Sequence, residues 1–72
     1  MVSISYNKLW KLLIDRGMNR HDLMIKTGVS SASVAKLGRS DNVTTDVLLK
    51  ICNGLNCRLE DIMETVEVIK ED

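Results

Sequence analysis

The sequence contains no proline and no phenylalanine, and only one tryptophan and one tyrosine among its 72 residues. Because proline ends or kinks helices, its absence leaves helix allowed along the whole chain. The core must be built mainly from Leu, Ile, Val and Met side chains. A chain this short buries only about 60% of the surface that its unfolded form exposes, so its core is marginal. These limits leave little room for a buried catalytic cavity, and they make a partner subunit one source of further stability.

Long apolar runs are also missing, since no stretch approaches the roughly 20 residues that cross a bilayer. Residues 1–5 lack the charged and apolar regions of a secretion signal. Cys52 and Cys57 are the only cysteines. Two are too few for a disulfide scaffold, and we interpret both as free thiols in a reducing compartment. We therefore expect a cytoplasmic protein with no membrane segment.

Net charge is absent as well, because ten Lys and Arg residues balance ten Asp and Glu residues. The charges are nevertheless separated along the chain. Residues 1–42 carry an excess of four positive charges, and residues 43–72 carry an excess of four negative charges. A molecule polarised in this way has a basic end that can meet phosphates and an acidic end that would turn away from them. Small proteins often show some asymmetry by chance, so the charge pattern alone does not establish a nucleic-acid site.

Apolar spacing and turn residues predict five helices separated by short polar joints. The third is expected from Ser31 to about Leu37, and the fifth from about Arg58 onward. The expected N-caps are Ser5, Asn19, Ser30 and Thr44, and the expected helix terminators are Gly17, Gly28, Gly38 and Gly54. Asp22 stands three residues after Asn19, where it can complete a capping box. The apolar side of the fifth helix would carry Leu59, Ile62, Met63 and Val66.

The two ends of the chain allow two predictions. Val2 and Ile4 alternate with polar residues, as do Val66 and Val68, which is typical of strands. Two short terminal strands, paired within one chain or across a dimer, are one prediction. A last helix that continues to about Lys70 is the other. We expect a single domain over residues 1–72, with residues 64–72 as a candidate dimerisation tail.

The most informative stretch is residues 20–37, which indicates two short helices joined by a tight turn. Gly28 stands where the first of these helices must reverse, a position that favours the left-handed φ that glycine reaches without strain. Val29 can pack between the helices, and Ser30 begins the second one. In this arrangement one helix is held across its partner and pushed into the major groove of DNA.

Helical geometry predicts which side of the third helix would face DNA. At about 100° per residue, Val34 and Leu37 fall on one side and pack inward. The residues expected to point outward are Ser31, Ala32, Ala35, Lys36 and Arg39. Small outward residues let a helix backbone lie deep in a groove, whereas a helix that only faces solvent more usually carries Glu, Lys or Gln. The pattern therefore favours DNA binding over two helices that only pack against each other and bind nothing.

In this order and spacing the motifs resemble the Cro-like, lambda-repressor-like helix-turn-helix regulators, also called the XRE family. The resemblance runs from about Leu9 to Ile62 and rests on Arg16-Gly17-Met18-Asn19, Leu23, Thr27-Gly28-Val29-Ser30, Val34, Leu48-Leu49-Lys50-Ile51-Cys52 and Leu55-Asn56-Cys57-Arg58-Leu59-Glu60-Asp61-Ile62. It implies an all-α, compact five-helix DNA-binding domain, usually a homodimer, that represses or activates transcription at an operator.

The chain departs from the family pattern at three places. Met24 stands where a small residue is common, and Leu13 stands where an Arg is common. The run Lys36-Leu37-Gly38-Arg39 lacks the acidic residue that often precedes the glycine after the recognition helix. These changes place the chain in a side branch of the family and affect how it would dock on DNA.

The resemblance also implies roles for individual residues. Arg20 matches a position that touches phosphate, and Ser31 and Ala32 match positions that read base edges. Few groups for direct readout of the bases are present here, because an alanine can only pack against a thymine methyl. Phosphate contacts are expected where a helix amino terminus offers free N–H groups. The full expected DNA-binding set is Arg20, Ser31, Ala32, Ala35, Lys36, Arg39, Asn42, Thr44 and Thr45.

Other chemistry is not indicated. His21, Cys52 and Cys57 do not have the spacing of zinc ligands. His21-Asp22 and the serines at 30, 31 and 33 suggest no hydrolase, since neighbours on a helix point about 100° apart. We therefore expect no enzyme activity, no cofactor, no metal and no small-molecule site. The leading hypothesis is a homodimeric regulator of a double-stranded DNA operator, and the alternative is a protein-interaction or antitoxin-like adaptor with the same fold.

Overall fold

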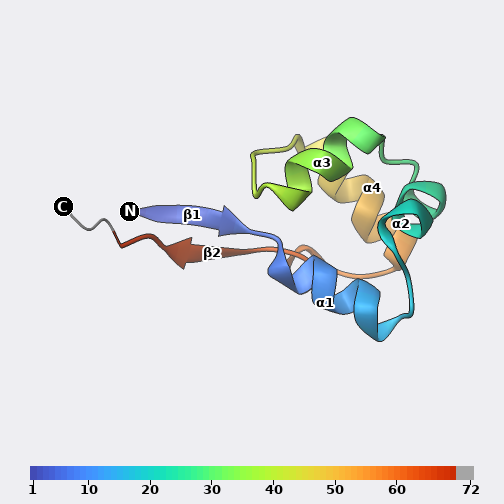
Figure 1. The fold of residues 1–72 in the computed structure, drawn as a ribbon, viewed down its shortest axis with the longest axis horizontal. Helices are drawn as coiled ribbons and strands as arrows, with labels where there is room; N and C mark the ends of the chain where they lie inside the picture. Colours follow the sequence, from blue (N-terminus) through green and yellow to red (C-terminus); the bar gives the residue numbers. More distant parts are fainter. Residues whose placement is uncertain (70–72) are drawn as a thin grey trace.

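The computed structural model describes residues 1–69, which form a helical body and a projecting two-stranded ribbon (Figure 1). The elements in order are β1 (Val2–Ser5), α1 (Asn7–Asp15), α2 (Arg20–Thr27), α3 (Ser31–Gly38), α4 (Thr45–Leu55), the 3-10 turn η1 (Leu59–Asp61) and β2 (Glu64–Glu67). The molecule is elongated, with extents of 42 × 23 × 18 Å. No helix among these residues is both long and apolar enough to span a membrane.

Local side-chain caps start three of the four helices found within residues 1–69. The Asn19 side chain accepts a hydrogen bond of 2.8 Å from the N–H of Asp22, whose carboxylate accepts one of 3.0 Å from the N–H of Asn19. Ser30 and Thr44 each accept from the N–H three residues further on, at 3.2 and 3.3 Å. The caps predicted at these three positions are confirmed. Each contributes about 1 kcal/mol to helix stability.

The cap predicted at Ser5 is wrong. Ser5 is the last residue of β1, and α1 begins after Tyr6, which forms no side-chain cap. The Oγ of Ser5 instead accepts a hydrogen bond of 3.3 Å from the N–H of Asn7. Ser5 is therefore used to join the strand to the helix.

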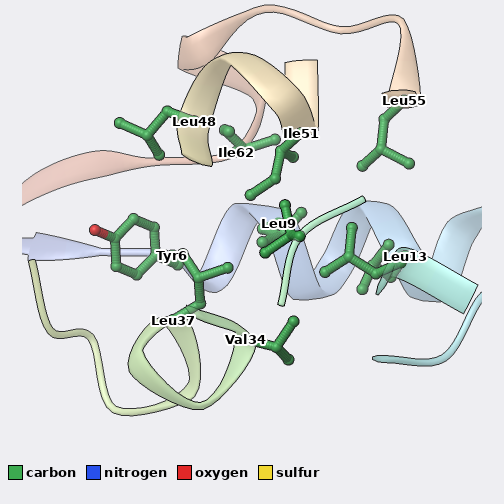
Figure 2. Close-up of a cluster of buried hydrophobic side chains, with 11 residues drawn as sticks. Tyr6, Leu9, Leu13, Val34, Leu37, Leu48, Ile51, Leu55 and Ile62 are labelled. Carbon is green, nitrogen blue, oxygen red and sulfur yellow. The ribbon is translucent and has the colours of Figure 1, made fainter. Parts of the chain in front are cut away.

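The core lies between the four helices α1, α2, α3 and α4. Figure 2 shows Leu9 and Leu13 of α1 between the α4 side chains on one side and Val34 and Leu37 of α3 on the other. The buried apolar residues are Tyr6, Leu9, Leu13, Leu23, Val29, Val34, Leu37, Leu48, Ile51, Leu55 and Ile62. Burying one such side chain stabilises the fold by about 1.5–3 kcal/mol. Most of these positions follow the helical spacing of the sequence, and the inward placement predicted for Val34 and Leu37 is confirmed.

Two of the four predicted glycine terminators have other roles. Gly38 is the last residue of α3, and the left-handed position after that helix is taken by Ser40, with φ of 57°. Gly54 lies inside α4, where an added Cβ would come within 2.7–2.9 Å of Thr27 and of the Lys26 carbonyl. Gly54 is therefore needed for the close contact between α2 and α4.

The predicted fifth helix is wrong, and the fold is mainly helical and not all-α. After Arg58 the chain makes only the short turn η1 and then enters β2. β1 and β2 pair antiparallel within the chain, in the register Val2↔Glu67, Ser3↔Val66, Ile4↔Thr65 and Ser5↔Glu64. This confirms the prediction of terminal strands. Ile62 is fully buried and anchors the turn, while backbone pairing with β1 favours an extended chain after it. Lys70, to which the alternative helix would have run, lies outside the described residues.

The ribbon has little core of its own. All four residues of β2 are exposed, and so are Val2 (62%) and Ile69 (83%) near its tip. Beyond the strand pairing, the N–H of Val68 donates to the Met1 carbonyl at 2.8 Å, and the Met1 amino group lies 3.0 Å from the Glu67 carboxylate. Exposed ion pairs of this kind stabilise by about 0–1 kcal/mol. The ribbon therefore has apolar surface that the rest of residues 1–69 does not cover.

Candidate nucleic-acid interface

The turn between α2 and α3 is fixed by a short chain of hydrogen bonds. Gly28 is left-handed, with φ of 75°, and its N–H donates to the Met24 carbonyl at 2.8 Å. The Thr27 hydroxyl donates to the Leu23 carbonyl at 2.6 Å and accepts from the N–H of Val29 at 3.3 Å. Val29 is buried in the core. The predicted left-handed Gly28 and the packing of Val29 are both confirmed, so α3 is held firmly against α2.

The two faces of α3 differ as the sequence predicted. Val34 and Leu37 are buried, whereas the outward face is exposed at Ser31, Ala32, Ala35 and Lys36. Before Lys36 this face carries no side chain longer than serine. A groove wall could therefore come close to the helix backbone, with Lys36 as the one long cationic side chain within the helix.

Arg39 is also exposed, but its charge is partly neutralised. It caps the end of α3, and its Nε lies 3.0 Å from the Asp41 carboxylate. The Asp41 backbone is held in place because the Tyr6 hydroxyl donates to its carbonyl at 3.1 Å. Sequence reasoning predicted Arg39 as an outward-pointing DNA-binding residue and did not find this pairing, although an acidic residue two positions away was the available signal. An approaching phosphate would have to compete with Asp41.

Arg20, the first residue of α2, lies against two other helices. The carbon at the centre of its guanidinium is 4.6 Å from the centroid of the Trp10 ring in α1. Its Nη1 is 3.1 Å from where a Cβ on Gly38 would lie, at the end of α3. The Arg20 side chain therefore stays exposed but is held between α1 and α3. Sequence reasoning predicted Arg20 as a site residue and missed its contact with Trp10.

The remaining predicted residues lie around the start of α4. Asn42, Thr44 and Thr45 are exposed, and Thr44 is the cap described above. Asp46 is in the first turn of α4, 3.4 Å from the ammonium group of Lys50. The helix end offers N–H donors, while the Asp46 carboxylate opposes an anion there. This makes the start of α4 a weaker phosphate site than the sequence alone suggested.

The two cysteines, Cys52 inside α4 and Cys57 just after it, are free thiols as predicted, and both are half-buried. Burial raises the pKa of the Cys57 thiol, and the neighbouring Cys52 raises it further. Within residues 1–69, no group of three His, Cys, Asp or Glu side chains is arranged to hold a metal ion.

Comparison with known proteins gave two matches. Residues 8–67 match the family model of the Cro/C1-type helix-turn-helix DNA-binding domain. Among solved structures, the chain is similar to one described as "Crystal structure of transcriptional regulator VanUg, Form II". The two are 52% identical in sequence, with a TM-score of 0.85 over 90% of this chain and 87% of that chain. A search of curated proteins found no match.

Proposed function

Because the chain belongs to the Cro/C1-type helix-turn-helix family of DNA-binding domains, we propose that it is a transcriptional regulator that inserts α3 into the major groove of an operator. The observation that carries this proposal is the outward face of α3, whose side chains are exposed and, apart from one lysine, no larger than serine. The family match also confirms that the chain is a DNA-binding domain and not an enzyme. The similarity to the regulator VanUg supports a role in transcription.

The residue roles follow from chemistry and exposure. Ser31, Ala32 and Ala35 face the base edges, where serine can hydrogen-bond to several bases and alanine can pack on a thymine methyl. Lys36 and Arg20 contact phosphates, and Arg39 joins them when a phosphate displaces Asp41. Phosphate contacts are also assigned to Asn42, Thr44 and Thr45 at the start of α4. Such contacts position the domain on DNA without reading its sequence.

We further propose that the regulator is a cytoplasmic homodimer, with residues 1–72 as one domain and the ribbon as the contact between copies. A two-stranded ribbon is only marginally stable alone in water, and this one exposes Val66, Val68 and Ile69. A second copy would cover these side chains. Two copies of α3 would then read half-sites of an inverted repeat about 34 Å apart.

The test begins with selection of bound sequences from random double-stranded DNA, using the purified protein. Affinity for the selected operator is then measured by fluorescence anisotropy over a range of salt concentrations. If each subunit neutralises about three or four phosphates, the slope of log K against log salt should be about −5 to −7. A slope near zero would instead favour the adaptor hypothesis, in which the same fold binds a protein.

Two variants make this test specific to the proposed face. Lys36→Ala should weaken binding to operator and random DNA alike and make the salt slope shallower by about one for each phosphate that the lysine neutralises. If Lys36→Ala changes which sequence is preferred, Lys36 reads a base instead. Asp41→Asn removes a carboxylate beside Arg39 and should strengthen binding to both DNAs by about two- to fivefold. An unchanged affinity would show that Arg39 does not approach phosphate.

A further inference from the structure

The contact between Trp10 and Arg20 joins an element outside the helix-turn-helix to a residue that faces the proposed DNA. Trp10 lies in α1, ten positions before Arg20. It is half-buried and packs against the core, so the ring has a fixed position. The Arg20 guanidinium stacks over that ring at 4.6 Å. Arg20 is thereby held on a surface that the body of the protein provides.

The end of α3 completes this arrangement. The Arg20 nitrogens Nη1 and Nη2 lie 3.1 and 3.3 Å from where a Cβ on Gly38 would be, so only glycine leaves them ordinary room. The last carbonyls of a helix carry partial negative charge, which attracts a cation placed there. The guanidinium stacks on a ring on one side and lies beside the last residue of α3 on another, and no carboxylate pairs with it among residues 1–69.

We propose that Trp10 is a positioning residue for DNA binding, which acts by holding the guanidinium of Arg20 at the end of α3. The proposal rests on the proposed function, since it assumes that Arg20 contacts phosphate. A free arginine side chain loses rotamer entropy when it is fixed. Stacking on Trp10 fixes much of that freedom before DNA arrives. Stacking leaves the N–H donors at the edge of the exposed guanidinium available, so a phosphate can accept hydrogen bonds from them.

The experiment compares ring-deleting and ring-keeping substitutions at Trp10. Trp10→Leu keeps apolar bulk but removes the ring, and Trp10→Phe keeps a smaller ring. Anisotropy with the selected operator is measured for each variant, for Arg20→Ala, and for the double variant Trp10→Leu with Arg20→Ala. Lys36→Ala, alone and combined with Trp10→Leu, is the matched control at another cation. Circular dichroism establishes that each variant is folded.

The proposal expects Trp10→Leu to weaken operator binding by about two- to fivefold for each bound subunit, the size of an exposed cation–π contact. Trp10→Phe should recover most of that affinity. Arg20→Ala should cost much less in the Trp10→Leu background than in the wild type, whereas Lys36→Ala should cost the same in both. Trp10 is the only tryptophan, so its fluorescence in the free protein should also change on Arg20→Ala.

Three results would overturn the proposal. The first is equal weakening by Trp10→Leu and Trp10→Phe, which would mean that bulk and not the ring matters. The second is strict additivity of the Trp10 and Arg20 substitutions. The third is unchanged binding in Trp10→Leu while Lys36→Ala still weakens it, in which case the proposed function stands without this inference. If the wild type shows no salt-dependent DNA binding, the proposed function itself fails.

Discussion

The helical body and the terminal ribbon are stabilised in different ways. All eleven buried apolar residues lie in the body or its connections, and none lies in β1 or β2. Within residues 1–69, the ribbon is held by backbone pairing, by the partly buried Ile4 and the buried Ser5, and by exposed ion pairs such as that of Lys8 with Glu64, at 3.4 Å. The body therefore has a core within one chain, while the ribbon exposes apolar side chains that only another surface could cover.

The difference in stability between the body and the ribbon is tested by removing one large side chain from each region. Leu37→Ala empties a fully buried position between α3 and α1 and should lower the free energy of unfolding by about 2–5 kcal/mol. Val66→Ala in β2 should cost less than about 1 kcal/mol, because Val66 is 36% exposed. Urea unfolding followed by circular dichroism measures both. Equal costs would show that the ribbon has a core role that its exposure does not reveal.

A second test shortens the ribbon and measures how tightly two copies of the chain associate. A chain that ends at Thr65 lacks Val66, Val68 and Ile69, and the dissociation constant of the proposed dimer should rise at least about tenfold, equivalent to about 1.4 kcal/mol. Sedimentation equilibrium measures the constant, and circular dichroism checks that the helical body remains folded. An unchanged dimer would move the contact to the body, with α4 and the residues that follow it as the next surface to test.

Tyr6 tests the junction between the two regions, since it follows β1 and its ring is buried in the core. Tyr6→Phe removes the hydrogen bond to the Asp41 carbonyl and should cost about 0.5–1.5 kcal/mol at pH 7. Burial raises the pKa of the Tyr6 phenol above its ordinary value of 10.0, and the nearby Asp41 charge raises it further. The stability linked to the neutral phenol is present below pH 10 and is lost as pH rises through the raised pKa.

The comparison of wild type with Tyr6→Phe should therefore depend on pH. The wild type should lose stability above about pH 10, because the Tyr6 phenol ionises more readily in the unfolded chain than in the folded one. The variant has no phenol at this position and should not show that decrease. Other groups that titrate at high pH, Cys57 among them, are present in both proteins and cancel in the difference. A difference that stays constant from pH 7 to pH 11 would mean that the phenol is open to water.

The smallest expected effect concerns the loop beside the ribbon. Ser40 adopts a left-handed φ of 57°, which costs a residue with a side chain about 1–2 kcal/mol. Ser40→Gly removes this strain but loosens the unfolded chain, so a net gain of about 0.5 kcal/mol is expected. Gly28→Ala, with φ of 75° at the original glycine, is the matched control and should destabilise. Thermal unfolding measures both, and a lower stability in Ser40→Gly would show that the serine side chain supports the loop.

Much of the body could be predicted because its signals are local. Asn19, Ser30 and Thr44 are caps whose partners lie three residues away, and the left-handed position at the turn is marked by Gly28 itself. The fifth helix could not be rejected, because Leu59, Ile62, Met63 and Val66 fit helical spacing as well as Val66 and Val68 fit a strand. Pairing with β1, from the other end of the chain, decides between them.

In the candidate interface, too, local features could be predicted from the sequence and tertiary contacts could not. Which residues of α3 face outward follows from helical geometry and was predicted correctly. The surroundings of Arg20 depend on tertiary contacts with Trp10 and Gly38, which no spacing rule could supply. The pairing of Arg39 with Asp41 had a local signal, because the two residues are only two positions apart. Contact with DNA at these residues remains a prediction.

The separation of the two faces of α3 has a consequence for how this scaffold can diversify. Its core is carried by Val34 and Leu37, while Ser31, Ala32, Ala35 and Lys36 contribute nothing to it. Substitutions at exposed positions usually change stability by no more than about 0.5 kcal/mol. The DNA sequence that α3 prefers can therefore change without compensating mutations in the core. A duplicated copy of the gene could acquire a new binding sequence while its product keeps the same fold.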